Sequence, residues 1–497
     1  MFLRMTYRHL SILAAVGLLT VSCQETDIQG ALKENRPPKT YLTLDGVDRP
    51  DDNRLNSQVR IRWWGDDPDG YVTGYQYNIN NTGWRFTAKT DSVFVLPIPT
   101  GSETADVLFS IRAIDNQGAL DPAPPSLTFP IVNSKPDIRF NTVEQPSDTT
   151  FHVFSFGWSA SDPDGSLNLD HTEIAINDTV NGWVTMPDGV NFVTVNIGNG
   201  SGATATGQIF LGKAYVSSAL TLPGIVMNGQ NTFYVRAVDQ AGARSTIERK
   251  TWYVKRQTSR VLVVNDDASP NTQTRLNNHL NWLRQSGITT VDVMQATDGT
   301  ATGGFKAPLS AAFQKTLDPT MNKTFAKWDY IYWVSENLDR NITYALEMTV
   351  DFFREGGRMY INIPTKTLPS SDPVFTFLPF DRLGVPGVTG AQGFLIQSNT
   401  ALTPVDVLTA PAGRIGAANI TGVSPLVPSG GSKVLYNAVF RVRQLIGSQL
   451  YTGNPAIAVL GSDGNMAFLG LDAASINPAD IQPMIRFIVI DQLGFQN

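Results

Sequence analysis

Apolar and polar positions follow different patterns in the two halves of the chain. Over residues 39–256, short runs alternate between apolar and polar side chains, as in "YQYNI" (75–79) and "TEIAI" (172–176), with Gly, Pro, Asn and Asp between the runs. A period of two is typical of strands that bury one face. Many short strands joined by turn residues predict β-sandwiches.

The first half contains two copies of one sequence unit. Each copy opens with W-x-x-x-D-P-D-G, at residues 63–70 and 158–165, and closes with R-A-[IV]-D-x-x-G, at 112–118 and 236–242. A Gly-Trp pair lies between these motifs in both copies. Landmarks that recur in the same order indicate a duplicated domain.

These landmarks resemble the fibronectin type III and immunoglobulin-like modules of bacterial surface proteins. The likeness covers residues 39–255. It implies two all-β sandwich domains, 39–133 and 134–256. Such modules serve as spacers or binding platforms and are seldom catalytic.

The D-P-D-G stretches have two interpretations, a turn or a calcium site. Proline presets φ, Asp accepts hydrogen bonds from backbone N–H groups, and Gly adopts conformations that other residues avoid, so a turn is a sufficient explanation. Calcium takes about six to eight oxygen ligands, more than the carboxylates of either copy supply, so the turn is favoured. The calcium candidates are Asp67, Asp69 and Asp115, with Asp66 as an alternative, in the first copy and Asp162, Asp164 and Asp239 in the second.

The tryptophan side chains of the two copies are expected to lie in the cores of the two sandwiches. An early strand carries one of Trp63 and Trp64 in the first copy and Trp158 in the second. Trp84 and Trp183 follow the glycines of the Gly-Trp pairs. A sugar-stacking platform is the alternative for this last pair, and a buried partner of a neighbouring strand is the more common role.

From residue 258 the pattern changes to long apolar runs that alternate with helical sequence. "RVLVVNDD" (260–267) is continuously apolar before its polar end, which is typical of a parallel strand buried on both faces. Residues 274–287 place leucines on one helical face. Further strands are predicted at 328–335 and 358–364. This order predicts an α/β doubly wound sheet over residues 258–497.

The second half resembles the class I glutamine amidotransferase-like, flavodoxin-like fold. The clearest piece is the helix that ends in Gly-Gly-Arg (356–358) before a strand. That family needs a cysteine nucleophile on the turn after a strand, with histidine as base. This chain has no cysteine after Cys23, and Pro364 follows the strand instead. The resemblance therefore implies the fold without the glutaminase activity.

Polar residues at the predicted strand ends are the remaining candidates for a ligand site. Open α/β sheets bind ligands outside the carboxyl ends of their strands. The alternative is that these residues only cap strands and form turns. A Pro-, Gly- and Thr-rich insertion, 365–431, is expected to cover such a pocket or to form a contact face. The ligand-binding candidates are Asn265, Asp266, Asp267, Ser335, Glu336, Asn337 and Asp472.

The start of the chain has the features of an export signal. Arg4 and Arg8 precede an apolar run of eleven residues, 11–21. A membrane-spanning helix needs about 20, so residues 1–22 are interpreted as a signal peptide.

The sole cysteine, Cys23, follows this run directly and resembles the acylated cysteine of the bacterial lipoprotein lipobox. The match departs from the usual pattern at Thr20, where a leucine is expected. An ordinary secretory signal with an incidental cysteine is the alternative. Residues 23–38 are polar and predicted to be a tether. Their acidic start resembles the surface-export signal of Bacteroidota lipoproteins, which favours the cell surface over the periplasmic face of the outer membrane.

Charge and composition narrow the function. The net charge is −6 and no basic patch stands out, which argues against a nucleic-acid partner. The leading prediction is a non-enzymatic lipoprotein that binds or scaffolds, with the membrane, a protein complex or a glycan as partner. The alternative is a hydrolase of glycans or peptides that uses two strand-end carboxylates as acid and base. A third interpretation is an accessory subunit of an export or nutrient-uptake complex, with the insertion 365–431 as docking surface. No cofactor is expected apart from the calcium considered above.

Overall fold

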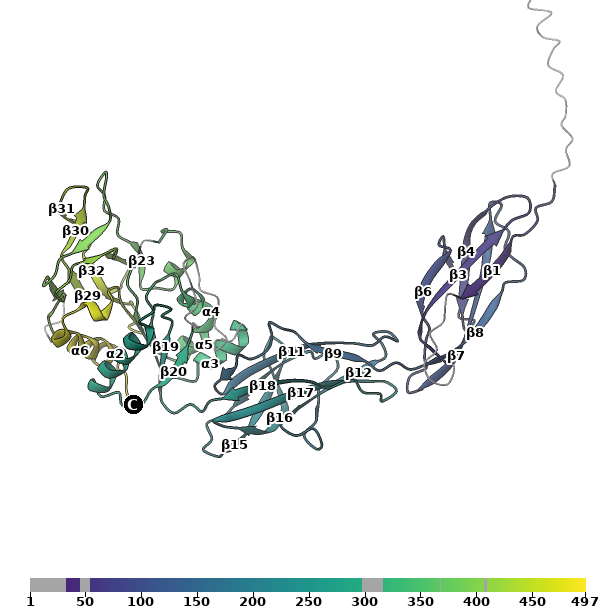
Figure 1. The fold of residues 1–497 in the computed structure, drawn as a ribbon, viewed down its shortest axis with the longest axis horizontal. Helices are drawn as coiled ribbons and strands as arrows, with labels where there is room; N and C mark the ends of the chain where they lie inside the picture. The colour runs from purple at the N-terminus through teal and green to yellow at the C-terminus, as the bar shows by residue number, and fades with distance from the viewer. Residues whose placement is uncertain (1–32, 45–53, 297–315, 367, 406–408) are drawn as a thin grey trace, which may run out of the picture. The chain divides into compact units, whose positions relative to one another are not determined.

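Two compact units make up the structure, Met1–Asn133 and Ser134–Asn497 (Figure 1). The predicted signal peptide, Cys23 and the first part of the tether lie outside the described residues. No helix of the described part is long and apolar enough to cross a membrane. The computed structural model describes residues 33–44, 54–296, 316–366, 368–405 and 409–497.

The first unit is a β-sandwich of a three-stranded and a five-stranded sheet. The strand order is β1-β3-β6 in one sheet and β2-β8-β7-β4-β5 in the other. Along β3 the burial alternates, so that Trp63 points into the core while Trp64 is 50% exposed and stacks on Tyr41. The strands are β1 (Lys39–Leu44), β2 (Leu55–Asn56), β3 (Gln58–Asp66), β4 (Val72–Ile79), β5 (Arg85–Thr87), β6 (Asp91–Val95), β7 (Thr104–Asp115) and β8 (Ser126–Val132).

The second sandwich has the sheet orders β10-β18-β17-β12-β13 and β16-β15-β14-β11-β9. Trp158 is fully buried in its core, and Phe156 stacks on Phe233 with ring centroids 3.8 Å apart. The strands are β9 (Asp137–Phe140), β10 (Thr149–Thr150), β11 (Val153–Ser161), β12 (Leu169–Ile176), β13 (Val184–Thr185), β14 (Phe192–Ile197), β15 (Thr204–Leu211), β16 (Val216–Val226), β17 (Gly229–Asp239) and β18 (Glu248–Val254).

The C-terminal part is built on one large sheet whose first five strands are parallel, in the order β20-β19-β21-β22-β33. Two apolar clusters cover its two faces: α2 and α6 contribute to one, and α3, α4 and α5 to the other. Because both faces are covered, these strands are apolar almost throughout, as their sequences predict. The elements are β19 (Val261–Asn265), α2 (Thr272–Gln285), β20 (Asp292–Gln295), α3 (Asn322–Phe325), β21 (Tyr330–Val334), α4 (Ala345–Met348), α5 (Val350–Arg354), β22 (Arg358–Asn362), β33 (Met466–Leu469) and α6 (Pro478–Arg486).

Antiparallel strands extend this sheet beyond β33 in the order β32-β29-β25-β26, and β23 pairs with β28 beside β32. A separate four-stranded sheet has the order β27-β24-β30-β31. The predicted insertion therefore supplies strands to both sheets. Its strands and their partners are β23 (Phe380–Leu383), β24 (Phe394–Ile396), β25 (Ala401–Pro404), β26 (Gly413–Arg414), β27 (Ile420–Thr421), β28 (Leu426–Pro428), β29 (Lys433–Ala438), β30 (Phe440–Arg443), β31 (Ser448–Leu450) and β32 (Ala456–Leu460).

Short helical turns complete the C-terminal part. They are the π-helical segments η2 (Leu317–Met321) and η6 (Phe487–Gln492) and the 3₁₀ helices η3 (Asn341–Tyr344), η4 (Pro373–Thr376) and η5 (Ala473–Ser475).

The second sandwich and the C-terminal part are joined by a polar and aromatic junction. Asp292, at the start of β20, accepts hydrogen bonds from the backbone nitrogens of Thr258 (3.0 Å) and Ser259 (3.1 Å) and from the indole of Trp328 (2.9 Å). Trp328 in turn meets the ring of Phe151 edge-on, with centroids 4.8 Å apart. The contact of Trp328 with Phe151 crosses between the two domains. So do two lysine hydrogen bonds, from Lys327 Nζ to the Ile197 carbonyl (3.4 Å) and from Lys255 Nζ to the Val293 carbonyl (3.3 Å).

Candidate functional site

Asp266 lies directly after β19 and is completely buried. Its Oδ1 accepts a hydrogen bond from the Asn341 amide (2.8 Å), and its Oδ2 accepts from the backbone nitrogen of Ile342 (3.1 Å) and from the Trp333 indole (3.3 Å). Burial raises the pKa of the Asp266 carboxyl to about 8, and the neighbouring carboxylate of Glu336 adds to the rise. The three donors hold η3 against the end of β19.

Asp267 and Asp472 share one arginine. Arg275 of α2 lies with its Nε 2.6 Å from Asp267 Oδ2 and its Nη1 2.7 Å from Asp472 Oδ2. The second oxygen of each carboxylate accepts a backbone hydrogen bond, from Ser269 (2.7 Å) and Ala474 (3.0 Å) respectively. The guanidinium therefore ties the end of β19 to the turn after β33.

The residues after β21 are bound in the same way. Glu336 Oε1 pairs with Arg340 at 2.6 Å, and its Oε2 accepts a hydrogen bond from the backbone nitrogen of Ala268 (3.0 Å). Ser335 donates its hydroxyl to the Asp266 carbonyl (2.8 Å). The remaining two candidates are also engaged, since Asn265 donates to Thr272 Oγ1 (3.1 Å) and Asn337 Oδ1 accepts from the backbone nitrogen of Asp339 (3.4 Å).

The structure thus brings the strand-end carboxylates to one edge of the sheet but leaves them committed to internal partners. A general acid must reach the bond that it protonates, and Asp266, whose raised pKa would suit that role, exposes no surface. Glu336 is paired with Arg340, and Asp267 and Asp472 are both paired with Arg275. This arrangement supports the cap-and-turn interpretation rather than a site for ligand chemistry.

Sequence reasoning missed the partners that hold this network. Arg340 follows Glu336 at the i,i+4 spacing that often marks an ion pair, so a local signal existed. Arg275 and Asn341 meet their aspartates across the fold, and the sequence holds no short-range signal for those contacts. Asn362, at the end of β22, was also missed; its amide donates to the carbonyls of Leu469 and Leu471 (3.0 and 2.7 Å).

The D-P-D-G stretches make the same turn in both sandwiches. The first aspartate accepts a hydrogen bond from the backbone nitrogen of the second: Asp67 from Asp69 at 3.3 Å, and Asp162 from Asp164 at 2.7 Å. The second aspartate then accepts from the backbone of the chain that leads into the domain. Asp69 binds Arg36 N (3.2 Å) and Asp164 binds Ser134 N (2.6 Å). The motif is therefore a turn that also fixes the incoming strand.

The last carboxylate of each calcium set caps the R-A-[IV]-D-x-x-G turn. Asp115 accepts from the backbone nitrogens of Gln117 and Ala119 (both 2.8 Å), and Asp239 accepts from Ala243 (2.7 Å). Within the residues that the structure describes, no group of three or more His, Cys, Asp or Glu side chains could hold a metal ion. These contacts support the turn interpretation of Asp67, Asp69, Asp115, Asp162, Asp164 and Asp239.

The D-P-D-G aspartates of the second copy, Asp162 and Asp164, are buried, whereas Asp67 and Asp69 of the first copy are half-buried. Burial raises the pKa of Asp162 to about 6, and the charges of Asp164, Asp239 and Asp137 add to the rise. In the first copy, the Asn35 amide donates to Asp115 (2.7 Å) and lowers the pKa of that carboxyl. The pKa shifts of Asp162, in the D-P-D-G turn of the second copy, and of Asp115, in the closing motif of the first, therefore have opposite directions.

Trp84 and Trp183 each lie under the arginine of the closing motif. The guanidinium carbon of Arg112 is 4.1 Å from the ring centroid of Trp84, and that of Arg236 is 3.9 Å from Trp183. Both rings are half-buried, and the arginine occupies one face of each. Cation–π pairing with the neighbouring strand is therefore their role in the fold.

Comparison with solved structures finds β-sandwich modules. The fibronectin(III)-like modules of Clostridium thermocellum CbhA match with 13% sequence identity and a TM-score of 0.16, over 44% of this chain and 95% of theirs. A two-domain fibronectin type III segment of chicken tenascin matches with 14% identity and a TM-score of 0.19, over 44% of this chain and 99% of that segment. The D00-D0 domain of intimin matches with 11% identity and a TM-score of 0.16, over 42% and 98%. The likeness concerns the fold alone. Comparison with protein-family models and with curated proteins gave no match.

Proposed function

We propose that the chain is a non-enzymatic binding or scaffold lipoprotein, anchored in the outer membrane through an acylated Cys23 and displayed at the cell surface. The proposal that the protein is not an enzyme is supported by the strand-end network. In it, all four carboxylates bind internal partners: Asp266, Asp267, Glu336 and Asp472. The two sandwiches would space the C-terminal part away from the anchor. Anchoring by several acyl chains is stable, since each buried CH₂ contributes about 0.8 kcal/mol.

The C-terminal part is, on this proposal, a degenerate amidotransferase-like domain. Its parallel strands, numbered along the chain, have the order 2-1-3-4-5 of flavodoxin-like sheets. Ile363, Pro364 and Thr365 follow β22, where that family has its nucleophile. Such a domain would serve as a rigid platform for binding.

The proposed partner surface is the turn of the β30–β31 hairpin (Figure 1). Leu445 and Ile446 at this turn are 84% and 89% exposed, and Leu450 on β31 is also exposed. Exposed apolar side chains that gather in this way mark interaction sites. Arg443 at the base of the turn adds positive charge, so the expected partner is a protein with an apolar pocket and an acidic rim.

The test is cross-linking of intact cells followed by recovery of the full-length lipoprotein. A stoichiometric membrane partner is expected with the wild type and with Leu167→Ser, because Leu167 is 91% exposed but lies on the second sandwich. The partner should be lost with the double change Leu445→Ser and Ile446→Ser. Recovery of the protein alone would contradict the accessory-subunit function, and a partner retained by the double variant would contradict this surface.

The hydrolase alternative rests on one observation, the raised pKa of Asp266 beside Glu336. Glycan and peptide substrates incubated with wild type and with Asp266→Asn would distinguish the two. Turnover by the wild type that the variant lacks, with unchanged thermal unfolding, would favour the hydrolase.

A further inference from the structure

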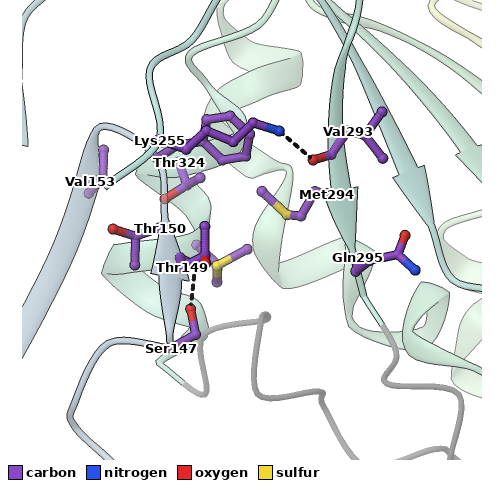
Figure 2. A pocket seen from close by; sticks show the side chains of 11 residues that line it. Ser147, Thr149, Thr150, Val153, Lys255, Val293, Met294, Gln295 and Thr324 are labelled. Atoms are coloured by element: carbon purple, nitrogen blue, oxygen red, sulfur yellow. Dashed lines mark hydrogen bonds between the residues drawn. The ribbon is translucent and has the colours of Figure 1, made fainter. Parts of the chain in front are cut away.

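A cavity of about 210 Å³ lies between the second sandwich and the C-terminal part (Figure 2). The sandwich contributes residues from β10, β11 and the end of β18, and the C-terminal part contributes β20, η2 and α3. Both sides belong to the unit Ser134–Asn497, and the edge-on contact of Trp328 with Phe151 joins them. Ligand pockets occur preferentially where two domains meet.

Apolar side chains line the cavity from both sides, beside polar ones. Phe151 and Val153 line it from the sandwich, and Met294 and Met321 from the other side. Thioether side chains adapt to irregular shapes and make favourable contacts with aromatic rings. A cavity of about 150 Å³ is enough to hold benzene, so this one accommodates a single aromatic ring with a short substituent.

One cation borders this apolar space. Lys255 extends across the cavity, with its Nζ donating to the Val293 carbonyl at 3.3 Å and lying 5.2 Å from the Phe151 ring centroid (Figure 2). An ammonium has three N–H donors, and this long hydrogen bond uses one of them. The hydroxyls of Ser147 and Thr324, by contrast, donate to the backbone carbonyls of Thr149 and Thr320, both at 2.8 Å. The lysine therefore has N–H donors left for an incoming acceptor.

We propose that this cavity binds a small carboxylate with an apolar body of about one aromatic ring. The ring would lie between Phe151 and the two methionines, and the carboxylate would accept hydrogen bonds from the Lys255 ammonium. A free aromatic acid and the C-terminal carboxylate of a peptide that ends in an aromatic residue have this same chemistry.

The test is isothermal titration of the full-length protein with 3-phenylpropionate and with its neutral match, 3-phenylpropanol. We expect the acid to bind at least about tenfold more tightly than the alcohol, which corresponds to about 1.4 kcal/mol. The peptide Ala-Ala-Phe with a free carboxylate, compared with its C-terminal amide, distinguishes the two sources. Binding of the free peptide acid at least as tightly as 3-phenylpropionate would assign the site to peptide ends, and weaker binding would assign it to free acids. Failure of every probe to bind, or equal affinity of acid and alcohol, would overturn the proposal.

Two variants and a control test whether the acid and the alcohol bind in this cavity. Lys255→Met keeps the length of the stem and removes the charge, so the preference for acid over alcohol should disappear. Met294→Trp fills the cavity and should abolish binding of both. Lys213→Met is the matched control, because Lys213 also lies over a phenylalanine ring, that of Phe192, but outside the cavity. Its affinities should equal those of the wild type. Undiminished binding by Met294→Trp would overturn the assignment, and if that variant does not fold, the loss of preference in Lys255→Met decides.

Discussion

The two sandwich domains share their motifs but differ in the outer face of one equivalent strand. In β3 of the first, Arg60 and Arg62 alternate with the buried core residues and are exposed. In β11 of the second, Ser155 and Gly157 stand at these positions and are buried. Ser155 shares a hydrogen bond with Thr320 of η2 in the C-terminal part.

This difference shows how a duplicated domain becomes part of a larger unit. Two charged side chains keep a strand face in water, because their burial without partners would be costly. Small neutral side chains let another element approach. The second sandwich is accordingly joined to the C-terminal part in one compact unit, whereas the first forms a unit by itself. The predictions below test that contrast, from the largest expected effect to the smallest.

The core tryptophans should show the separation of the units most strongly. Trp63 and Trp158 are both buried, and truncation of such a residue to alanine costs about 3–5 kcal/mol. In calorimetry, Trp63→Ala should lower only the transition of the first unit. Trp158→Ala should lower the transition of Ser134–Asn497. A shift of both transitions by either variant would contradict the division into two units.

Asp292 should hold the segment between β18 and β19, which connects the second sandwich to the C-terminal part, against β20. Its carboxylate binds the backbone of Thr258 and Ser259 and the indole of Trp328. Asp292→Ala leaves the buried Trp328 indole and the backbone nitrogens of Thr258 and Ser259 without this acceptor, so we expect a loss of about 2–3 kcal/mol. Because Trp328 packs against Phe151 of the second sandwich, we expect this unit to unfold in two calorimetric transitions in the variant and in one in the wild type. Asp292→Asn keeps one acceptor oxygen and should have a smaller effect; an unsplit transition in the alanine variant would contradict the role of this junction.

Replacement of the two closing-motif arginines, Arg112 and Arg236, should lower the free energy of unfolding by different amounts. Arg236 pairs with the Glu173 carboxylate at 2.5 Å, whereas Arg112 donates to the neutral amide of Gln76 at 2.9 and 2.7 Å. Arg236→Met leaves a half-buried carboxylate without its main partner, so we expect a loss of about 1–2 kcal/mol.

Arg112→Met should cost less, about 0.5–1 kcal/mol, chiefly from the lost cation–π contact with Trp84. Chemical denaturation of each unit measures both losses. Adding Glu173→Gln to Arg236→Met should recover part of the stability, and equal losses for the two arginine variants would contradict this account.

How much the sequence predicts depends on the range of the interactions. The duplicated motifs predict two sandwiches, because turns and strand alternation are local, and the buried apolar runs predict the strands of the C-terminal sheet. The meeting of Asp266 with Glu336 at one sheet edge follows from the parallel order of their strands. Arg275, which pairs with Asp267, lies on helix α2. The rotation of this helix about its axis is set by packing in the folded protein, which the sequence does not reveal. The sequence alone therefore could not show whether these residues form a ligand site or a structural network.

The last expected effect, no larger than that of Arg236→Met, concerns pH and Asp162. The pKa of this carboxyl is raised to about 6 in the fold, above its ordinary value of 3.8. Its contribution to stability is therefore complete below about pH 4 and is lost as the pH rises through 6. Asp162→Asn should consequently stabilise the second unit at pH 7 and bring little gain at pH 4. One pKa unit corresponds to about 1.4 kcal/mol, and solvent screening reduces the effect, so we expect about 1 kcal/mol.

Asp115 in the first sandwich should have the opposite sign. Its pKa is lowered by the Asn35 amide, so the carboxylate stabilises the fold above its unfolded pKa and loses that contribution as the pH falls. Asp115→Asn should therefore destabilise the first unit at pH 7, while Asp162→Asn stabilises the second. Urea unfolding of both variants at pH 4 and pH 7 measures the two signs. Effects of the same sign would mean that the burial of Asp162 and the Asn35 hydrogen bond to Asp115 do not set the two signs.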